Sequence, residues 1–201
     1  MGINKTFLKS IIYLTLFILF VSIIFDIFTS AYYRAIIWAA FFIIFLILLK
    51  KSKIPRIALF YLSLLLLLVI LGEYFLYNLI PFFDKIVHFL SQLIICPLIL
   101  YLTKDKIKDK KLLVLFCIAF AITLSVVWEI TEYSFDHAVD SKMQGVYFQE
   151  GQFFGTYERL YTPILTEIDD TMSDLIFNAI GACTFGFLYL LDLRKRKKNS
   201  K

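Results

Sequence analysis

The sequence predicts an all-α, polytopic membrane protein, a helical bundle with six transmembrane helices. Of its 201 residues, 60% are hydrophobic and only 18% are charged, whereas charged residues make up about 25% of a soluble domain. Six apolar stretches are long enough to cross a hydrocarbon core, which takes roughly 20 helical residues. The connections are short apart from one, which predicts a single transmembrane domain over residues 1–201. The predicted helices span about residues 7–30, 32–49, 57–80, 86–103, 112–135 and 171–193.

The first apolar stretch follows Lys5 and Lys9, an arrangement that also precedes the apolar core of a signal peptide. Its apolar run is longer than the roughly 7–15 residues of such a core. Asp26 stands late in this run, and a second apolar stretch follows almost directly. We therefore expect an uncleaved first transmembrane helix.

Lys and Arg residues are concentrated in alternate connections, namely before the first helix, at 50–56, at 104–111 and at 194–201. All but four of the 21 basic residues lie there. By the positive-inside rule, both termini are expected in the cytoplasm and the protein in the plasma membrane. Anionic lipid of the inner leaflet explains the net charge of +5 without a nucleic-acid partner.

Cysteines fall inside the fourth, fifth and sixth apolar stretches, as Cys96, Cys117 and Cys183. A free cysteine in an apolar helix usually behaves as a small buried hydrophobe. We therefore expect neither a disulfide nor a cysteine metal site.

The fourth helix begins with the charged sequence DKIVHF (84–89), just after Pro81. Asp84 and His88 are four residues apart and therefore share a helix face. Lys85, one residue from Asp84, is expected to point elsewhere on the helix. The orientation places this segment where the chain enters the membrane from the outer face.

Acidic residues line the outer ends of the fifth and sixth helices at helical spacing. The fifth helix leaves the membrane with a stripe made of Glu129, Glu132, Tyr133 and Asp136. In the sixth helix, every fourth residue is polar, at Asp170, Asp174 and Asn178. Positions four apart drift by only about 40° around a helix, so these three side chains are expected to face one groove.

These polar residues are predicted to lie in one shallow layer of the membrane. At a rise of about 1.5 Å per residue, His88 and Asp174 lie roughly 6 Å below their helix starts, Glu132 about 5 Å and Glu129 about 9 Å. Charges at such depth usually face a bundle interior or a wet cavity, and they are functional candidates. The substrate-binding candidates are Asp84, His88, Glu129, Glu132, Asp174 and Asn178, among which His88, Glu129 and Asp174 are also the catalytic candidates. Glu73 is a further candidate whose facing is left open.

Carboxylates gathered without a counter-charge repel one another, so a cation is expected to complete the set. Oxygen ligands with one imidazole suit Mg²⁺, Mn²⁺ or Ca²⁺ better than structural zinc. The candidate metal ligands are Asp84, His88, Asp170 and Asp174. Two alternatives stay open: the charges snorkel to the interface or tie helix ends together, or Arg159 reaches in from the loop.

The motifs DKxxHF (84–89), WEITEY (128–133) and DLIFNAIGA (174–182) resemble those of the VanZ-like membrane proteins and, more closely, of the YjdF-type inner-membrane proteins. The resemblance covers roughly residues 72–190. It also includes Gln144-Gly145 before an Asp-rich entry to the last helix. It departs from the VanZ pattern at Gly186, which comes five residues after Gly181 instead of four. The resemblance implies a helical membrane protein with an outer-face polar site, and VanZ-like members are associated with glycopeptide-antibiotic tolerance. It implies no reaction.

The connection at 136–170 is too long for a simple link between helices and is rich in Phe and Tyr. Long structured loops are often functional, and aromatic residues are enriched at membrane interfaces. We expect residues 146–162 to lie over the polar groove, either as a lid or as an interfacial anchor.

Three functions stay open. The groove binds, and possibly acts on, a lipid-linked or polar headgroup substrate with a divalent cation; or the protein is a small transporter coupled to protons or cations; or it is a non-catalytic envelope factor. The sequence has no Gly-rich phosphate loop, no HExxH helix and no GxSxG elbow. Membrane lipid is the expected partner. Whether any substrate is turned over, and the oligomeric state, are left open.

Overall fold

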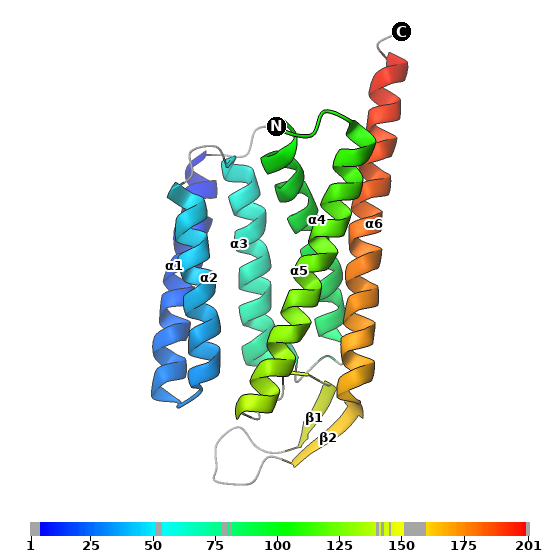
Figure 1. Cartoon of the computed structure of the whole chain (residues 1–201). Helices are drawn as coiled ribbons and strands as arrows, with labels where there is room; N and C mark the ends of the chain where they lie inside the picture. Colours follow the sequence, from blue (N-terminus) through cyan, green and yellow to red (C-terminus); the bar gives the residue numbers. More distant parts are fainter. Residues whose placement is uncertain are drawn as a thin grey trace. The chain divides into compact units, whose positions relative to one another are not determined.

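The computed structural model describes residues 5–50, 54–77, 80, 82–139, 141, 143–144, 146–150 and 160–199. It confirms the predicted fold class, because six helices are long and apolar enough to cross a membrane. They are drawn in Figure 1. The α-helices are α1 (Lys5–Phe28), α2 (Tyr32–Lys50), α3 (Arg56–Leu71), α4 (Phe83–Thr103), α5 (Lys110–Val139) and α6 (Glu167–Asn199).

The largest difference from the predicted boundaries is in the third span, which was expected to reach residue 80. Its α-helix ends at Leu71 and continues as a π-helical segment, η1 (Gly72–Leu76). Gly72 permits the tight packing here, because a Cβ atom on it would lie 2.9 Å from the ring of Tyr77 and 3.1 Å from that of Phe83. Single π-helical turns inside helices are frequent at functional sites.

Polar side chains define where α5 and α6 begin. The Asp109 carboxylate accepts hydrogen bonds from the backbone N–H groups of Leu112 (2.9 Å) and Lys111 (2.8 Å), which lower the pKa of this carboxyl. At α6, the Thr166 hydroxyl donates to Asp169 Oδ2 (2.7 Å) and accepts from the Asp169 N–H (3.2 Å). Both are N-terminal caps of the usual kind.

The chain separates into two compact units, Met1–Val69 and Ile70–Lys201. In the first unit, α1 packs against α2. Asp26 of α1 is fully buried and accepts hydrogen bonds from Arg34 (2.9 Å) and from the Trp38 indole (2.9 Å) of α2. Ser30, in the turn between the two helices, has φ 61°. The first helix pair is therefore held together by a paired buried acid.

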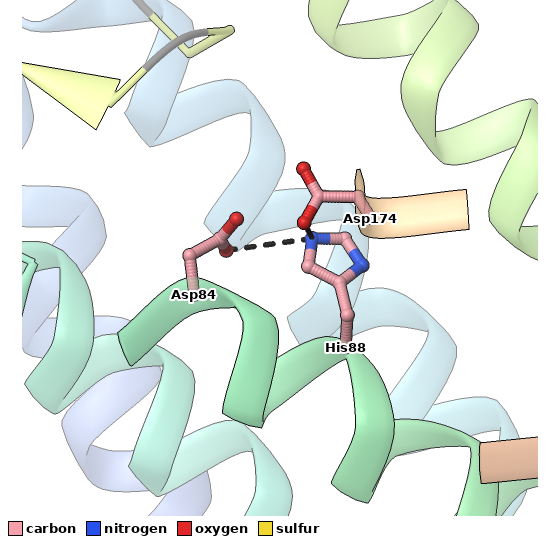
Figure 2. A group of neighbouring side chains, drawn as sticks. All are labelled: Asp84, His88 and Asp174. Carbon is pink, nitrogen blue, oxygen red and sulfur yellow. Dashed lines mark ion pairs between the residues drawn. The ribbon is translucent and has the colours of Figure 1, made fainter. Parts of the chain in front are cut away.

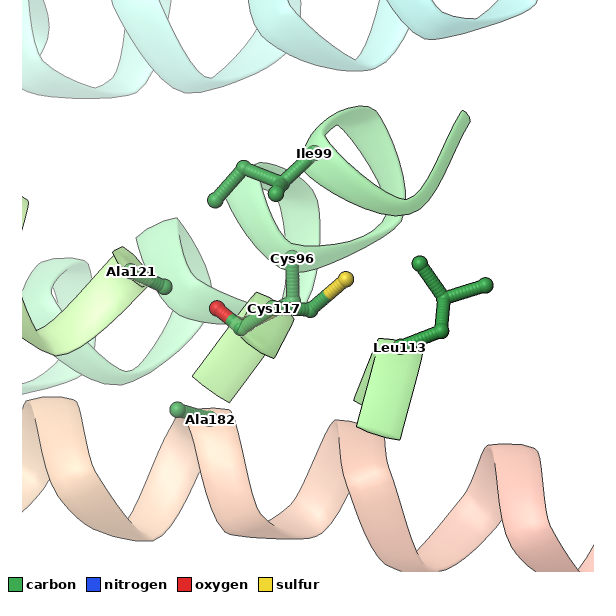
Figure 3. Packing of buried hydrophobic residues seen from close by; sticks show 6 residues of the cluster. All are labelled: Cys96, Ile99, Leu113, Cys117, Ala121 and Ala182. Carbon is green, nitrogen blue, oxygen red and sulfur yellow. The ribbon is translucent and has the colours of Figure 1, made fainter. Parts of the chain in front are cut away.

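In the second unit, α4, α5 and α6 pack against one another. A Cβ atom on Gly181 of α6 would lie 2.5 Å from the backbone oxygen of Phe89, so only glycine allows α6 to approach α4 this closely. An apolar cluster lies between the three helices (Figure 3), formed by Cys96, Ile99, Leu113, Cys117, Ala121 and Ala182.

All three cysteines are free, as expected. Cys96 and Cys117 are buried, but Cys183 is exposed on the surface of α6. The expectation of a small buried hydrophobe is therefore wrong for Cys183. Its neighbour Ala182 takes the position facing the bundle, and Cys183, one residue further around the helix, points outward.

The long connection contains an antiparallel pair of strands, β1 (Val146–Glu150) and β2 (Leu160–Leu165), with Glu150 opposite Leu160. Asp136 organises the start of the connection, because its carboxylate accepts from the N–H groups of Met143 and Gln144 (both 2.7 Å) and from Ser141. Residues 151–159, which form the middle of the predicted lid or anchor, lie outside the described residues.

Candidate functional site

Polar side chains meet where α4 and α6 begin and α5 ends. The sequence places them on faces that the packing of these helices turns inward, at 85, 88 and 92 on α4, 125, 129 and 132 on α5, and 170, 174 and 178 on α6. Each is at most 9% exposed. Phe82, in the left-handed conformation (φ 65°), precedes the first turn of α4. The set comprises Lys85, His88, Gln92, Ser125, Glu129, Glu132, Asp170, Asp174 and Asn178.

Asp84, His88 and Asp174 point toward one another, as Figure 2 shows. His88 Nε2 lies 3.4 Å from Asp84 Oδ1 and 3.6 Å from Asp174 Oδ1. One ligand atom from each residue lies within 4.8 Å of the other two, a spacing that could hold a metal ion. The Asp84 side chain is 29% exposed, while that of Asp174 is 1% exposed, so the group opens on the side of Asp84.

Lys85 lies inside this polar group, and the expectation that it points elsewhere on the helix is wrong. Its Nζ lies 2.6 Å from Asp174 Oδ1 and 3.3 Å from Asp84 Oδ2, and it also pairs with Asp170. Neighbouring positions on a helix differ by about 100° in direction, which turns Lys85 toward α6 and Asp84 toward the opening. The long lysine side chain still reaches the Asp84 carboxylate.

On its inner side, the His88 ring continues into a chain of hydrogen bonds. Its Nδ1 lies 2.9 Å from Asn178 Nδ2. Gln92 Nε2 donates to Asn178 Oδ1 (2.9 Å) and to Ser125 Oγ (2.8 Å). Gln92 and Ser125 were not among the residues predicted from the sequence. The available signal was the spacing of Lys85, His88 and Gln92, three and four residues apart on one face of α4.

Glu129 and Glu132 bring two further carboxylates to the site from α5, 4% and 9% exposed. Neither Glu129 oxygen has a hydrogen-bond partner among the described residues. Glu129 lies within electrostatic reach of His88 and Asp84, and Glu132 within reach of Glu129 and Asp174. A buried carboxylate without a partner is costly, and its presence indicates that another group completes the site.

Tyr77, just after η1, is a second residue that the sequence did not predict. Burial, and then the charges of Asp84 and Glu73, raise the pKa of its phenol well above the usual value. Tyr77 is therefore close to the polar group and keeps its proton. An aromatic residue at the end of an apolar stretch resembles an ordinary interfacial anchor, so the sequence carried no signal for this role.

The structure thus joins most of the predicted site residues. Asp84, His88, Asp170, Asp174 and Asn178 form one connected network. Asp136 is not part of it, because its carboxylate caps the start of the connection. His137 is exposed and stacks on Tyr133. Arg159 and Gly145 lie outside the described residues.

The donor set determines what the site can bind. Five carboxylates, those of Asp84, Glu129, Glu132, Asp170 and Asp174, face one lysine and one imidazole. Carboxylate oxygens with one histidine nitrogen suit a hard divalent cation. The same three elements, an imidazole between carboxylates, are also the usual parts of general acid–base chemistry.

No curated protein and no solved structure matches the chain. One family model matches residues 7–195, which include all six helices and every site residue named above. The chain therefore belongs to the family described as predicted membrane protein (DUF2238).

Proposed function

We propose that the polar group at the ends of α4, α5 and α6 binds a divalent cation and, through it, the polar headgroup of a lipid or lipid-linked molecule. The observation that carries this proposal is Glu129, a buried carboxylate with no hydrogen-bond partner among the described residues, close to a triad with metal-ligand spacing. Lys85 neutralises only part of the charge. A divalent ion would supply two further positive charges.

A headgroup is favoured over a free soluble ligand by the surroundings of Asp84. The Asp84 carboxylate is 29% exposed, and its neighbours Phe82 and Ile86 are both 49% exposed. Apolar side chains beside a polar opening at the end of a transmembrane helix suit a molecule with one end in lipid and the other in the site. His88, Glu129 and Asp174 are the groups that would transfer protons if the bound molecule is turned over.

We further propose that this site faces outward in the plasma membrane, with both termini in the cytoplasm. The distribution of Lys and Arg supports this orientation. Single cysteines at Lys106 and Ser141, in a chain whose three native cysteines are replaced by alanine, test it with a membrane-impermeant maleimide. We expect labelling at Ser141 in intact cells and at Lys106 only after permeabilisation. Labelling of both positions from the same side would contradict the orientation.

The resemblance to YjdF-type and VanZ-like proteins favours a role in the cell envelope, which accommodates a non-catalytic factor as well as an enzyme. A transporter is less well supported, because the apolar cluster around Cys96, Cys117 and Ala182 begins one helical turn beyond Gln92. That cluster interrupts the polar side chains among the described residues.

The direct test is to purify the protein from membranes and to measure bound metal and bound lipid together. We expect divalent metal and a co-purifying lipid, and we expect a chelator to remove the metal and weaken retention of the lipid. Incubation of the metal-loaded protein with that lipid then shows whether it is turned over. Protein that carries neither metal nor lipid, and whose thermal stability does not respond to added Mn²⁺ or Mg²⁺, would contradict the proposal.

A further inference from the structure

Two buried amides, those of Asn178 and Gln92, connect the candidate cation ligand His88 to the interior of the bundle. Asn178 is 1% exposed and Gln92 2%. The glycine contact between α4 and α6 brings them together, because Gly181 lies one turn after Asn178, and a Cβ atom on it would lie 3.0 Å from Gln92 Cβ. These amides therefore form a built-in contact of the histidine ring.

The hydrogen bonds give this chain a direction. Gln92 donates its NH₂ group to Asn178 Oδ1 and to Ser125, so Asn178 presents its own NH₂ group to His88 Nδ1. A nitrogen that accepts a hydrogen bond carries no proton. In this arrangement neutral His88 holds its proton on Nε2, on the side of Asp84 and Asp174.

A bound cation requires the opposite arrangement. A metal bound at Nε2 needs the lone pair of that nitrogen, so the ring proton must be on Nδ1. Metal-binding histidines almost always donate that second N–H to an oxygen. Asn178 can supply this oxygen by turning its amide over.

Gln92 is able to follow that turn. Its Oε1 has no hydrogen-bond partner among the described residues, although the side chain is buried. After the turn, Oε1 can accept from the Asn178 NH₂ group and from the Ser125 hydroxyl, which replaces both hydrogen bonds that the Gln92 NH₂ group makes now. Both directions of the chain are therefore compatible with the same side-chain positions.

We propose that Asn178 and Gln92 are positioning residues that decide which ring nitrogen of His88 is available to a cation. Turning the two amides stabilises the ring with its proton on Nδ1 and leaves Nε2 free. The ring exchanges one proton with water at the open side of the site, and its total number of protons stays the same. The proposal rests on the cation-binding function for the role of Nε2.

The position of the ring proton is measurable because the chain has only two histidines. Protein labelled with ¹⁵N-histidine gives NMR signals from His88 and His137 alone, and H137Q assigns them. In metal-free protein we expect the His88 proton on Nε2. After addition of Mg²⁺ or, separately, Zn²⁺, both diamagnetic, we expect it on Nδ1, with His137 unchanged.

Two substitutions at Asn178 separate positioning from simple packing. Asn178→Asp can only accept from the ring while it is ionised, so we expect the proton on Nδ1 even without metal. Asn178→Leu offers no acceptor, and we expect cation affinity to fall by about 10–100-fold, as for other partners of metal-binding histidines. Gln92→Met acts one step further away, and we expect a smaller loss.

The outcomes distinguish this inference from the proposed function. If Mg²⁺ and Zn²⁺ bind while the His88 proton stays on Nε2, or if Asn178→Asp leaves the ring proton where it is in the wild type, the inference is overturned. If no cation binds and Asn178→Asp still moves the proton, the cation-binding function is wrong and control of His88 by Asn178 stands. Should Asn178→Asp not fold, the wild-type spectra with and without metal still decide the matter.

Discussion

Each of the two compact units buries acidic side chains inside helices that can cross a membrane, but the two units treat them differently. In the first unit, Asp26 is matched by Arg34 and Trp38, with both hydrogen bonds at 2.9 Å. In the second, Glu129 has no hydrogen-bond partner among the described residues, and five carboxylates share Lys85 and His88.

This difference separates architecture from function. A buried acid that is fully paired ties two helices together, and removing one partner leaves a costly buried group. A buried acid that is not paired lowers the stability of the protein, and such groups persist where they bind something. The comparison therefore assigns a structural role to Asp26 and a binding role to the acids of the second unit.

The largest expected effect on stability is that of Asp26→Ala. It leaves Arg34 and the Trp38 indole without their carboxylate, and we expect a loss of about 3 kcal/mol in the free energy of unfolding, at the lower end for a broken buried pair because Arg34 is partly exposed. SDS titration of the protein in detergent micelles measures this loss. Cation binding per folded molecule should not change, and an unfolding curve like that of the wild type would contradict the structural role.

The next largest effect concerns the candidate ligands themselves. We expect Asp174→Asn and His88→Ala each to weaken Mn²⁺ binding by roughly 100-fold or more, since even partners of metal ligands contribute 10–100-fold. The double variant should lose little more than either single one, because ligands of one ion act as a unit. Isothermal titration with Mn²⁺ measures the affinities.

Asp192→Asn is the matched control for these variants. Asp192 also lies on α6, but it is 48% exposed and pairs with Arg196 at 2.8 Å. Its substitution should leave Mn²⁺ affinity unchanged. If Asp174→Asn and His88→Ala bind Mn²⁺ as the wild type does, or if both fail to fold, the buried acids of the second unit are architecture as well.

The sequence alone predicted the parts of this picture that depend on one helix at a time. Hydropathy located six spans, and a period of four on α6 predicted that Asp170, Asp174 and Asn178 share a face. It could not locate Gln92 or Ser125, because an uncharged polar residue in an apolar helix is unremarkable until a neighbouring helix supplies its partner. Lys85 was misjudged because direction on a helix was considered and the reach of its side chain was not.

A smaller effect is expected from a change that alters the geometry of the site without altering its charge. In Gly181→Ala, the new Cβ atom would lie 2.5 Å from the backbone oxygen of Phe89, which cannot move aside without moving α4. Overpacking of this kind costs about 1–3 kcal/mol. We also expect weaker Mn²⁺ binding, because the contact between Gln92 and Asn178 is spread apart.

Gly186→Ala is the control for this variant. Its Cβ atom would meet Ile118 Cδ1 at 2.6 Å, the far end of a flexible side chain in the apolar part of the bundle. Thermal unfolding should show a smaller loss than in Gly181→Ala, and Mn²⁺ affinity should be kept. Equal Mn²⁺ binding by the two variants would mean that the close approach at Gly181 serves packing alone.

The smallest expected effect has the opposite sign, and it tests the comparison most directly. Glu129→Gln replaces an unpaired buried carboxylate by a neutral group of nearly the same shape. Because this removes a charge from a site where five carboxylates face one lysine and one imidazole, we expect metal-free protein to become more stable by about 1 kcal/mol, within the usual gain from relieving a strained functional site. Mn²⁺ affinity should fall at the same time. Glu167→Gln, on the exposed first turn of α6, should change neither quantity. A loss of stability comparable to that of Asp26→Ala would show that Glu129, like Asp26, holds helices together, and the distinction between the two units would then disappear.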